Sequence, residues 1–288
     1  MTFSDDRPTL AELRGKVQKR RHRVIGNWLA RRVGRPSAVY GTWLAIRLGM
    51  SANQVTVGAL LASVGAALAV GSGDRRGFVL GVGLAWLAFW LDHVDGQVAR
   101  WRGSSSLDGV YFDYLMHHVA NLALGFALGF GLAERSGDVL WAAGGSLIAL
   151  GWAVLGLHND CRYKAFFQRL KASPESYRVE GGSGGRPAPP PKWPTRGVGM
   201  VTYPAFKACE PHVVLVGLTG MAALAVVSAP AWVEAWRWSV RGMMALAPTL
   251  ATLRVARAIR GGSSEAEFAR WFRPEDRAID DQREATPL

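Results

Sequence analysis

The stretch VTVGALLASVGAALAVGSG, residues 55–73, contains no charged side chain and is long enough to cross a lipid bilayer as one helix. The hydrocarbon core of a bilayer requires roughly 20 predominantly apolar residues of helix. Two further uncharged runs of similar length lie at residues 139–157 and 213–233. Three such runs in a chain of 288 residues are hard to reconcile with a water-soluble core, so we expect an integral membrane protein.

Three shorter or less uniform runs extend this set. Residues 77–91 and 119–133 are uncharged, and each is bordered by ionisable side chains. Residues 236–259 carry arginines towards both ends, from which long side chains can reach the membrane surface. We therefore predict an all-α integral membrane protein built as a bundle of six transmembrane helices.

The charge distribution predicts how this bundle is oriented. The chain has 34 Lys and Arg against 22 Asp and Glu, a net charge of +12. Basic residues concentrate in residues 1–50, in residues 158–212 and from residue 254 onward, whereas the short connections between runs carry few. Because cytoplasmic loops are enriched in Lys and Arg, we expect both termini and the long loop in the cytoplasm, with the bundle in the cell inner membrane. Nucleic-acid binding explains this distribution less well.

The chain is expected to consist of three parts. These are a basic cytoplasmic N-terminal segment with an interfacial helix (1–50), a six-helix membrane catalytic domain (51–260) and a cytoplasmic C-terminal tail (261–288). The interfacial helix is predicted at residues 37–48, where tryptophan and leucine accompany arginine. The long cytoplasmic loop, residues 158–212, contains a flexible linker rich in Gly and Pro at residues 180–193.

The functional signal is LDHVDGQVARWRGSSSLDGVYFDYLMHH, residues 91–118, where ionisable groups enter the second and third runs. Asp92 and Asp95 are three residues apart and point to one side of a helix, and Asp113 and His117 share a stripe of the next helix. Ionisable groups at membrane depth indicate a functional site. Clustered carboxylates call for a divalent cation, and hard oxygen ligands favour Mg²⁺ or Mn²⁺. The competing explanation is that these acids pair with nearby arginines in a solvated loop.

The pattern from Asp92 to His117 reads D-x2-D-G-x2-A-R-x8-G-x3-D-x3-H. It resembles the signature of the CDP-alcohol phosphotransferases, also called CDP-alcohol phosphatidyltransferases, in which the last residue is Asp. Asn53 and Thr56 resemble the Asn-x-x-Thr element that opens the first span in that family. The resemblance implies a six-helix membrane enzyme of phospholipid biosynthesis, usually a homodimer, with its site open to the cytoplasm.

The resemblance also implies roles for the matched positions. Two Mg²⁺ or Mn²⁺ ions would be held by Asp92, Asp95, Asp113 and His117. The CDP moiety would be contacted by Asn53, Thr56, Gly96, Arg100, Ser106 and Gly109. Glycine leaves room for a nucleotide to approach the helix, and arginine offers a fork of donors to a diphosphate.

One position departs from the family pattern. The family's last aspartate, which the resemblance assigns as the base for the acceptor hydroxyl, is His117 here. A neutral imidazole can accept a proton near pH 7 and can ligate a metal, but it brings no negative charge. The second ion should then be held less strongly or be of another kind. Three alternatives stay open: His117 is the catalytic base, the site is degenerate and inactive, or His118 or a loop residue takes over.

The implied reaction is attack by an acceptor hydroxyl on the β-phosphate of a CDP-activated alcohol, with release of CMP. CDP-diacylglycerol is the expected donor, and the acceptor alcohol stays open. Arg162 and Lys164 are candidates for binding an anionic group on the acceptor, although ordinary cytoplasmic charge explains them at least as well. The alternative functions are a degenerate lipid- or nucleotide-binding membrane protein of the same fold, and an intramembrane prenyltransferase, whose N-D-x2-D-x3-D element this chain lacks.

Overall fold

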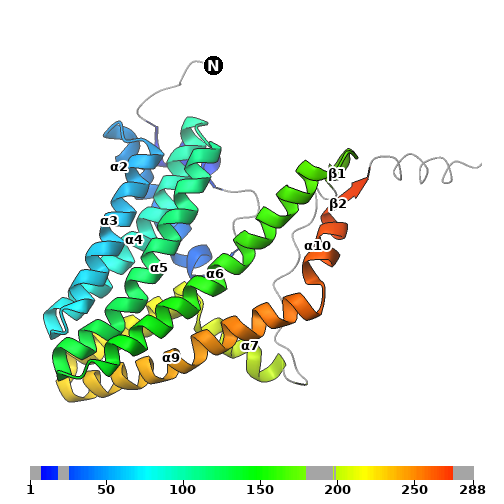
Figure 1. The fold of residues 1–288 in the computed structure, drawn as a ribbon. Coiled ribbons are helices and arrows are strands. Elements are labelled where there is room, and N and C mark those ends of the chain that lie inside the picture. Colours follow the sequence, from blue (N-terminus) through cyan, green and yellow to red (C-terminus); the bar gives the residue numbers. More distant parts are fainter. Residues whose placement is uncertain (1–7, 19–25, 180–196, 198, 275–288) are drawn as a thin grey trace, which may run out of the picture. The chain divides into compact units, whose positions relative to one another are not determined.

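The structure is a computed structural model that describes residues 8–18, 26–179, 197 and 199–274. The elements in chain order are α1 (Leu10–Lys16), the π-helix η1 (Ala30–Gly34), α2 (Arg35–Arg47), α3 (Ala52–Gly71), α4 (Arg75–Arg102), α5 (Leu107–Ser136), α6 (Leu140–Ala172), β1 (Tyr177–Val179), α7 (Gly199–Ala208), α8 (Pro211–Val227), α9 (Ala229–Arg260), α10 (Ser263–Trp271) and β2 (Phe272–Pro274). Helices dominate these residues, as predicted (Figure 1). The linker expected at residues 180–193 lies outside the described residues.

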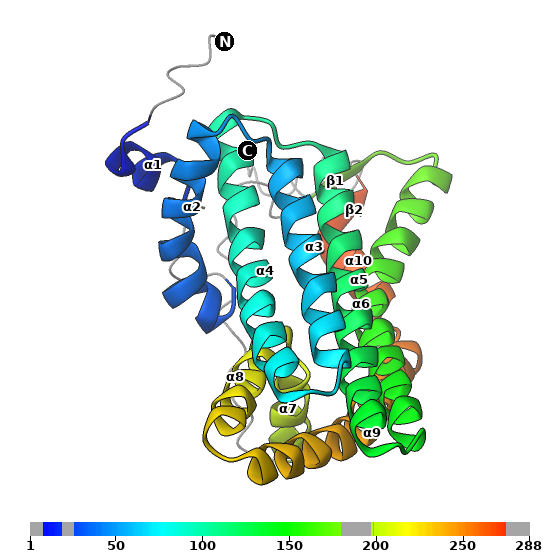
Figure 2. The ribbon, with the colours of Figure 1, turned by 90° about the vertical axis from the view of Figure 1, so that its left-hand side faces the viewer.

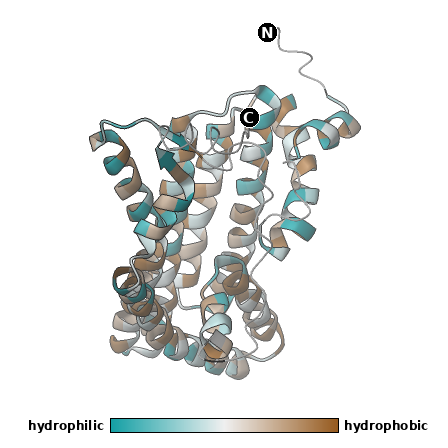
Figure 3. Ribbon diagram, turned by 90° about the vertical axis from the view of Figure 1, so that its right-hand side faces the viewer, coloured by the Kyte–Doolittle hydropathy of each residue, from teal (hydrophilic) through white to brown (hydrophobic). Residues whose placement is uncertain are grey.

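Four helices are long and apolar enough to cross a membrane, namely α3, α4, α5 and α6. Helices α7 and α8 are bent by 68° against each other and supply a fifth candidate if they count as one span. The hydropathy colouring shows long apolar stretches along these helices (Figure 3). The integral membrane class is therefore confirmed for the described part of the chain, with four to five candidate spans. The sixth expected span, residues 236–259, lies within α9, which is not among the candidates.

Several helices extend well beyond the uncharged runs that predicted them. Helix α4 continues through Asp92 and Asp95 to Arg102, and α6 continues to Ala172, where a cytoplasmic loop was expected from residue 158. Charged side chains do not interrupt the backbone hydrogen bonds of a helix, so an uncharged run marks the apolar part of a helix rather than its ends. Much of the first part of the expected loop is therefore helical.

The chain divides into two compact units. The first comprises Met1–Ala153 and Trp193–Pro248, and the second comprises Val154–Lys192 and Thr249–Leu288. Within the second unit, β1 pairs antiparallel with β2, and Phe268 contacts the rings of Phe166 and Tyr177. The candidate site, described below, lies in the first unit.

The centre of the first unit is formed by α3, which packs against both α4 and α5 (Figures 1 and 2). Small residues allow these helices to approach closely. A Cβ added at Gly81 of α4 would lie 2.6 Å from Val70 Cγ2 and 2.8 Å from the carbonyl oxygen of Ala66, both on α3. Small residues at helix contacts are the common means of close packing in lipid.

The GxxxG pair of α5 is used inside the chain. A Cβ at Gly125 would lie 2.7 Å from Ala149 Cα, and one at Gly129 would overlap the backbone of α6 near Gly145. The sequence left open whether Gly125 and Gly129 pack internally or form a dimer face. They pack against the first half of α6.

The residues of the predicted interfacial helix are helical in α2, while a position at the membrane interface stays a prediction. Buried polar groups join α2 to α4. The hydroxyl of Thr42 donates to Gln97 Oε1, and Gln97 Nε2 donates to the carbonyl oxygen of Arg35, each at 2.9 Å. Gln97 is only 1% exposed, so both its amide groups are satisfied within the fold. Helix α2 thus anchors the N-terminal region next to the motif on α4.

Candidate metal and nucleotide site

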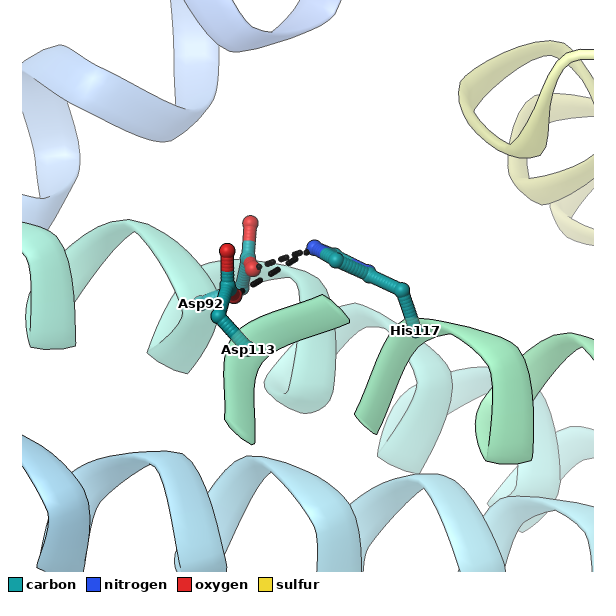
Figure 4. Close-up of side chains that lie close together, drawn as sticks. All are labelled: Asp92, Asp113 and His117. Carbon is teal, nitrogen blue, oxygen red and sulfur yellow. Dashed lines mark ion pairs between the residues drawn. The ribbon is translucent and has the colours of Figure 1, made fainter. Parts of the chain in front are cut away.

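Three ionisable side chains meet on α4 and α5. His117 Nε2 lies 3.1 Å from Asp92 Oδ1 and 3.5 Å from Asp113 Oδ1. One ligand atom from each residue lies within 4.8 Å of the other two, which suits a shared metal ion. Figure 4 shows the imidazole of His117 pointing at both carboxylates. The motif spacing therefore brings together three of the four predicted metal ligands.

The connection between the two helices explains this meeting. Helix α4 ends at Arg102 and is capped by Gly103, whose φ of +62° is readily adopted by glycine. Ser106 caps α5 by accepting from the backbone N–H of Gly109 at 3.0 Å. The chain thus reverses direction within a few residues. Asp92 and His117 lie about ten residues from this turn on either side, a rise of about 15 Å along each helix, so their side chains reach the same height.

Asp95 lies outside the three-residue group and is buried one turn away. It is 7% exposed and accepts a hydrogen bond from the hydroxyl of Thr56 at 2.7 Å. A capping box between Ser51 and Gln54 starts α3 and so fixes the position of Thr56 at the beginning of its second turn. The structure therefore places Thr56, a predicted nucleotide-binding residue, against a predicted metal ligand.

The other predicted nucleotide-binding residues form two small groups. Asn53, Ser106 and Gly109 lie together, since a Cβ at Gly109 would be 3.3 Å from Ser106 Oγ and 3.7 Å from Asn53 Oδ1. The guanidinium of Arg100 lies over Gly96, where an added Cβ would be 3.3 Å from a terminal nitrogen. Both groups lie at the end of the helices that carries the α4–α5 turn.

Arg100 is held by the N-terminal region, because its Nε donates to the carbonyl oxygen of Val17 at 2.6 Å. Arg100 lies near Arg35 as well, and the two guanidinium groups repel one another. Arg35 is partly buried, and this burial together with the charge of Arg31 lowers the pKa of its guanidinium. A group of basic side chains near the motif favours an anionic ligand.

His93 is a residue of the site that the sequence analysis did not single out. Its Nδ1 lies 3.3 Å from Asp92 Oδ2 and 2.9 Å from the carbonyl oxygen of Phe89. Its ring lies against η1, since a Cβ at Gly34 would be 2.8 Å from the His93 Nε2. The ionic contacts of Asp92 within the described residues are thus with His93 and His117, rather than with arginines as the competing explanation required. The sequence feature that could have pointed to His93 is its position directly after Asp92, the first aspartate of the motif.

Arg162 and Lys164 belong to the second unit, which is described by itself. Arg162 forms an ion pair with Glu267, and Lys164 is exposed. The acceptor-binding role suggested for these two residues stays a prediction.

Asp92 and His117 also line a partly open cavity of about 140 Å³ in the first unit. Its remaining lining comes from α3, α4, α5 and α8 and is mostly apolar. These residues are Ser63, Ala66, Ala85, Ala88, Phe89, Met116, Ala120, Asn121, Leu124, Pro211, Leu215 and Leu218. A site with two ionisable groups at one end and an apolar wall beyond them suits an amphipathic ligand.

Residues 50–161 match the model of the CDP-alcohol phosphatidyltransferase family. The chain carries a CDP-alcohol phosphatidyltransferase domain. This confirms the resemblance seen in the motif and the expectation of an enzyme, since the family consists of transferases of substituted phosphate groups. Comparison with the curated proteins gives no match.

The donor set fits the divalent metal that this family normally uses. Two carboxylates and one imidazole converge within ligand distance of a common point, and Asp95 lies one turn further along α4. Carboxylate oxygens suit Mg²⁺ and Mn²⁺. An imidazole nitrogen makes a site more selective for Mn²⁺ and later transition metals. The motif thus brings together Asp92, Asp113 and His117 as a group that could hold a metal ion.

Proposed function

We propose that this protein transfers a phosphatidyl group from CDP-diacylglycerol to the hydroxyl of an acceptor alcohol and releases CMP, as a step in phospholipid biosynthesis. The observation that carries the proposal is that Asp92 and His117 belong to the ionisable group and also line the apolar cavity. A CDP-activated lipid has a diphosphate next to an apolar tail, and this arrangement offers each part its own surroundings.

The ionisable group would hold the metal. Asp92, Asp95 and Asp113 are the proposed ligands, for two Mg²⁺ or Mn²⁺ ions. His117 Nε2 has a single lone pair, so it would ligate a metal only where it does not serve as the base. When bound, the ions would neutralise the diphosphate and the departing CMP. Thr56 positions Asp95 through its hydroxyl, and His93 positions Asp92 through Nδ1. Supporting hydrogen bonds of this kind orient metal ligands in proteins.

The nucleotide would lie towards the α4–α5 turn. Arg100 would donate to the diphosphate, with Gly96 leaving room beneath its guanidinium. Asn53, Ser106 and Gly109 would contact the rest of the CDP moiety, since they lie together at the ends of α3 and α5.

His117 would act as the general base. The neutral imidazole accepts the proton of the acceptor hydroxyl at Nε2, while the hydroxyl oxygen attacks the β-phosphorus. The bond from that phosphorus to the bridging oxygen breaks, and CMP leaves with the electron pair. In support, His117 Nε2 lies 3.1 Å from Asp92 Oδ1 and 3.5 Å from Asp113 Oδ1, beside the proposed metal ligands.

We also propose six spans, with α9 as the sixth, and cytoplasmic termini in an inner membrane protein. The concentration of Lys and Arg in the segments outside the apolar runs supports this orientation. A homodimer is proposed on the resemblance. Its contact surface should not involve Gly125 and Gly129, because α6 covers them.

The test is acceptor-dependent release of CMP by the purified protein in detergent. CDP-diacylglycerol and Mg²⁺ or Mn²⁺ would be supplied with glycerol 3-phosphate, inositol, inositol phosphate, serine or a sugar alcohol. CMP formed with one acceptor and lost in Asp92→Asn supports the proposal and names the alcohol. Binding of CDP-diacylglycerol without release of CMP with any acceptor would favour the degenerate alternative. Release of diphosphate from a supplied prenyl diphosphate, with no CMP formed, would favour the prenyltransferase. Absence of both binding and turnover would reject the proposed function.

A further inference from the structure

The wall of the cavity beside His117 contains an amide that the motif does not account for. Asn121 lies one turn beyond His117 on α5 and lines the same cavity as Asp92. Its side chain makes no hydrogen bond with any residue that the structure describes. The other neutral polar side chain in this lining, Ser63, donates to the carbonyl oxygen of Ala59 at 2.9 Å and is satisfied.

Asn121 is only partly buried, so its amide is open to the cavity. Leu124, Leu215 and Leu218 line the same space and offer no hydrogen-bonding group. In a mostly apolar ligand site, a few polar groups fix the orientation of the ligand and supply specificity. The amide therefore indicates a polar group of the ligand near Asn121.

The spacing along α5 indicates which polar group this is. The rise from His117 to Asn121 is about 6 Å, for four residues of helix. In a phosphatidyl group, six bonds join the phosphorus to the nearest ester carbonyl oxygen, and an extended chain advances about 1.2 Å per bond, or roughly 7 Å in all. With the phosphorus near His117, an ester carbonyl comes within reach of the Asn121 side chain.

The cavity has room for this part of the donor. Its volume of about 140 Å³ is close to that of an engineered apolar cavity of about 150 Å³ that binds benzene. That is enough for the glycerol and one ester group, while the hydrocarbon chains continue through the open side. An alkyl ether in place of the ester has no carbonyl oxygen and would leave the Asn121 amide unpaired.

We propose that Asn121 is a specificity-determining residue that donates a hydrogen bond to an ester carbonyl of the donor, so that the enzyme selects ester-linked over ether-linked CDP-activated glycerolipids. The proposal rests on the proposed function and adds the chemical class of the donor. It concerns recognition of the donor beyond the reacting phosphates and leaves the identity of the acceptor open.

The test compares two donors of equal chain length, CDP-diacylglycerol and CDP-dialkylglycerol, in the CMP-release assay. The wild-type protein is expected to favour the ester donor by about tenfold in kcat/KM, the size of one good neutral hydrogen bond. Asn121→Leu has nearly the same shape without the amide, and the ratio should fall to about 1. Asn121→Asp keeps the shape and removes the donor N–H, so its ratio of ester to ether activity should fall as well. This second variant provides the test if the leucine variant does not fold. Ser146→Ala, an exposed position on α6, is the control for handling and should keep the wild-type ratio.

The outcomes distinguish failure of the Asn121 role from failure of the proposed transferase activity. A wild-type protein that uses both donors equally, or an Asn121→Leu variant that keeps the tenfold ratio, would overturn the role of Asn121 while leaving the transferase activity in place. Absence of CMP from both donors in the wild-type protein would instead reject the proposed function. A change in KM for the ester donor with little change in kcat would support recognition of the donor over a general loss of structure.

Discussion

Replacing Thr56 by valine tests whether this residue acts on the nucleotide or on a metal ligand. The Thr56 hydroxyl donates to Asp95 Oδ2 at 2.7 Å, and the two residues are 5% and 7% exposed. Valine has the shape of threonine without the hydroxyl, so packing is retained and one buried hydrogen bond is lost. A hydrogen bond to a charged group contributes about 1.5–3 kcal/mol, and loss of a partner behind a metal ligand typically lowers metal affinity or activity about 10–100-fold.

The expected result for Thr56→Val is a loss of CMP release of about 10–100-fold at low Mg²⁺, partly restored by raising Mg²⁺ or Mn²⁺. Thr56→Ser keeps the hydroxyl and is the matched control, with a metal dependence close to wild type. The assay is CMP release at fixed CDP-diacylglycerol over a series of metal concentrations, with thermal unfolding in detergent to confirm that both variants fold. Direct contact with CDP predicts another pattern: the KM for the donor would rise and the metal dependence would not move. A Thr56→Val variant with the metal dependence of Thr56→Ser would refute the positioning role.

The remaining predictions concern the ionisable group and the helix contacts. Asp92→Asn should abolish CMP release while the unfolding temperature stays near wild type, and full activity in this variant would remove the metal-site proposal. His117→Ala should lower kcat about 10²-fold or more, whereas His117→Asp, which restores the family residue, should retain activity; an alanine variant as fast as wild type would exclude His117 as the base. Gly125→Ala should destabilise the protein by about 1–3 kcal/mol, because the new Cβ would lie 2.7 Å from Ala149 Cα. Gly83→Ala is its control, since a Cβ there meets no atom within 4 Å, and equal unfolding of the two variants in a denaturant titration would contradict the packing argument.

The sequence predicted the membrane-spanning helices best where a run of residues carries no charge, because such a run has few alternatives to a helix in lipid. The uncharged runs led to α3, α4, α5 and α6, because a bilayer excludes unsatisfied backbone and unpaired charge. The same reasoning was weakest at α9, where arginines interrupt the run, and at the ends of α4 and α6, where polar residues continue a helix. Residue spacing carries no direct information about where such helices stop.

The site shows a similar division. The motif spacing alone placed Asp92, Asp113 and His117 together, since helical periodicity fixes which residues share a face and a short turn aligns two neighbouring helices. It also led to the family that residues 50–161 match. Spacing within one segment could not show that Thr56 bonds to Asp95, because that contact depends on how α3 packs against α4.

What the sequence by itself determined is therefore the membrane class, the family that residues 50–161 match and the meeting of Asp92, Asp113 and His117. All of these follow from local periodicity and a long fixed motif. The tertiary structure alone decided the supporting contacts. These are the contact of His93 with Asp92, the packing of Gly125 against α6, and the mostly apolar cavity that Asn121 lines together with Asp92 and His117. Each depends on distances between helices that are far apart in the chain. Such distances are set by the packing of many side chains at once, and no single stretch of sequence specifies them.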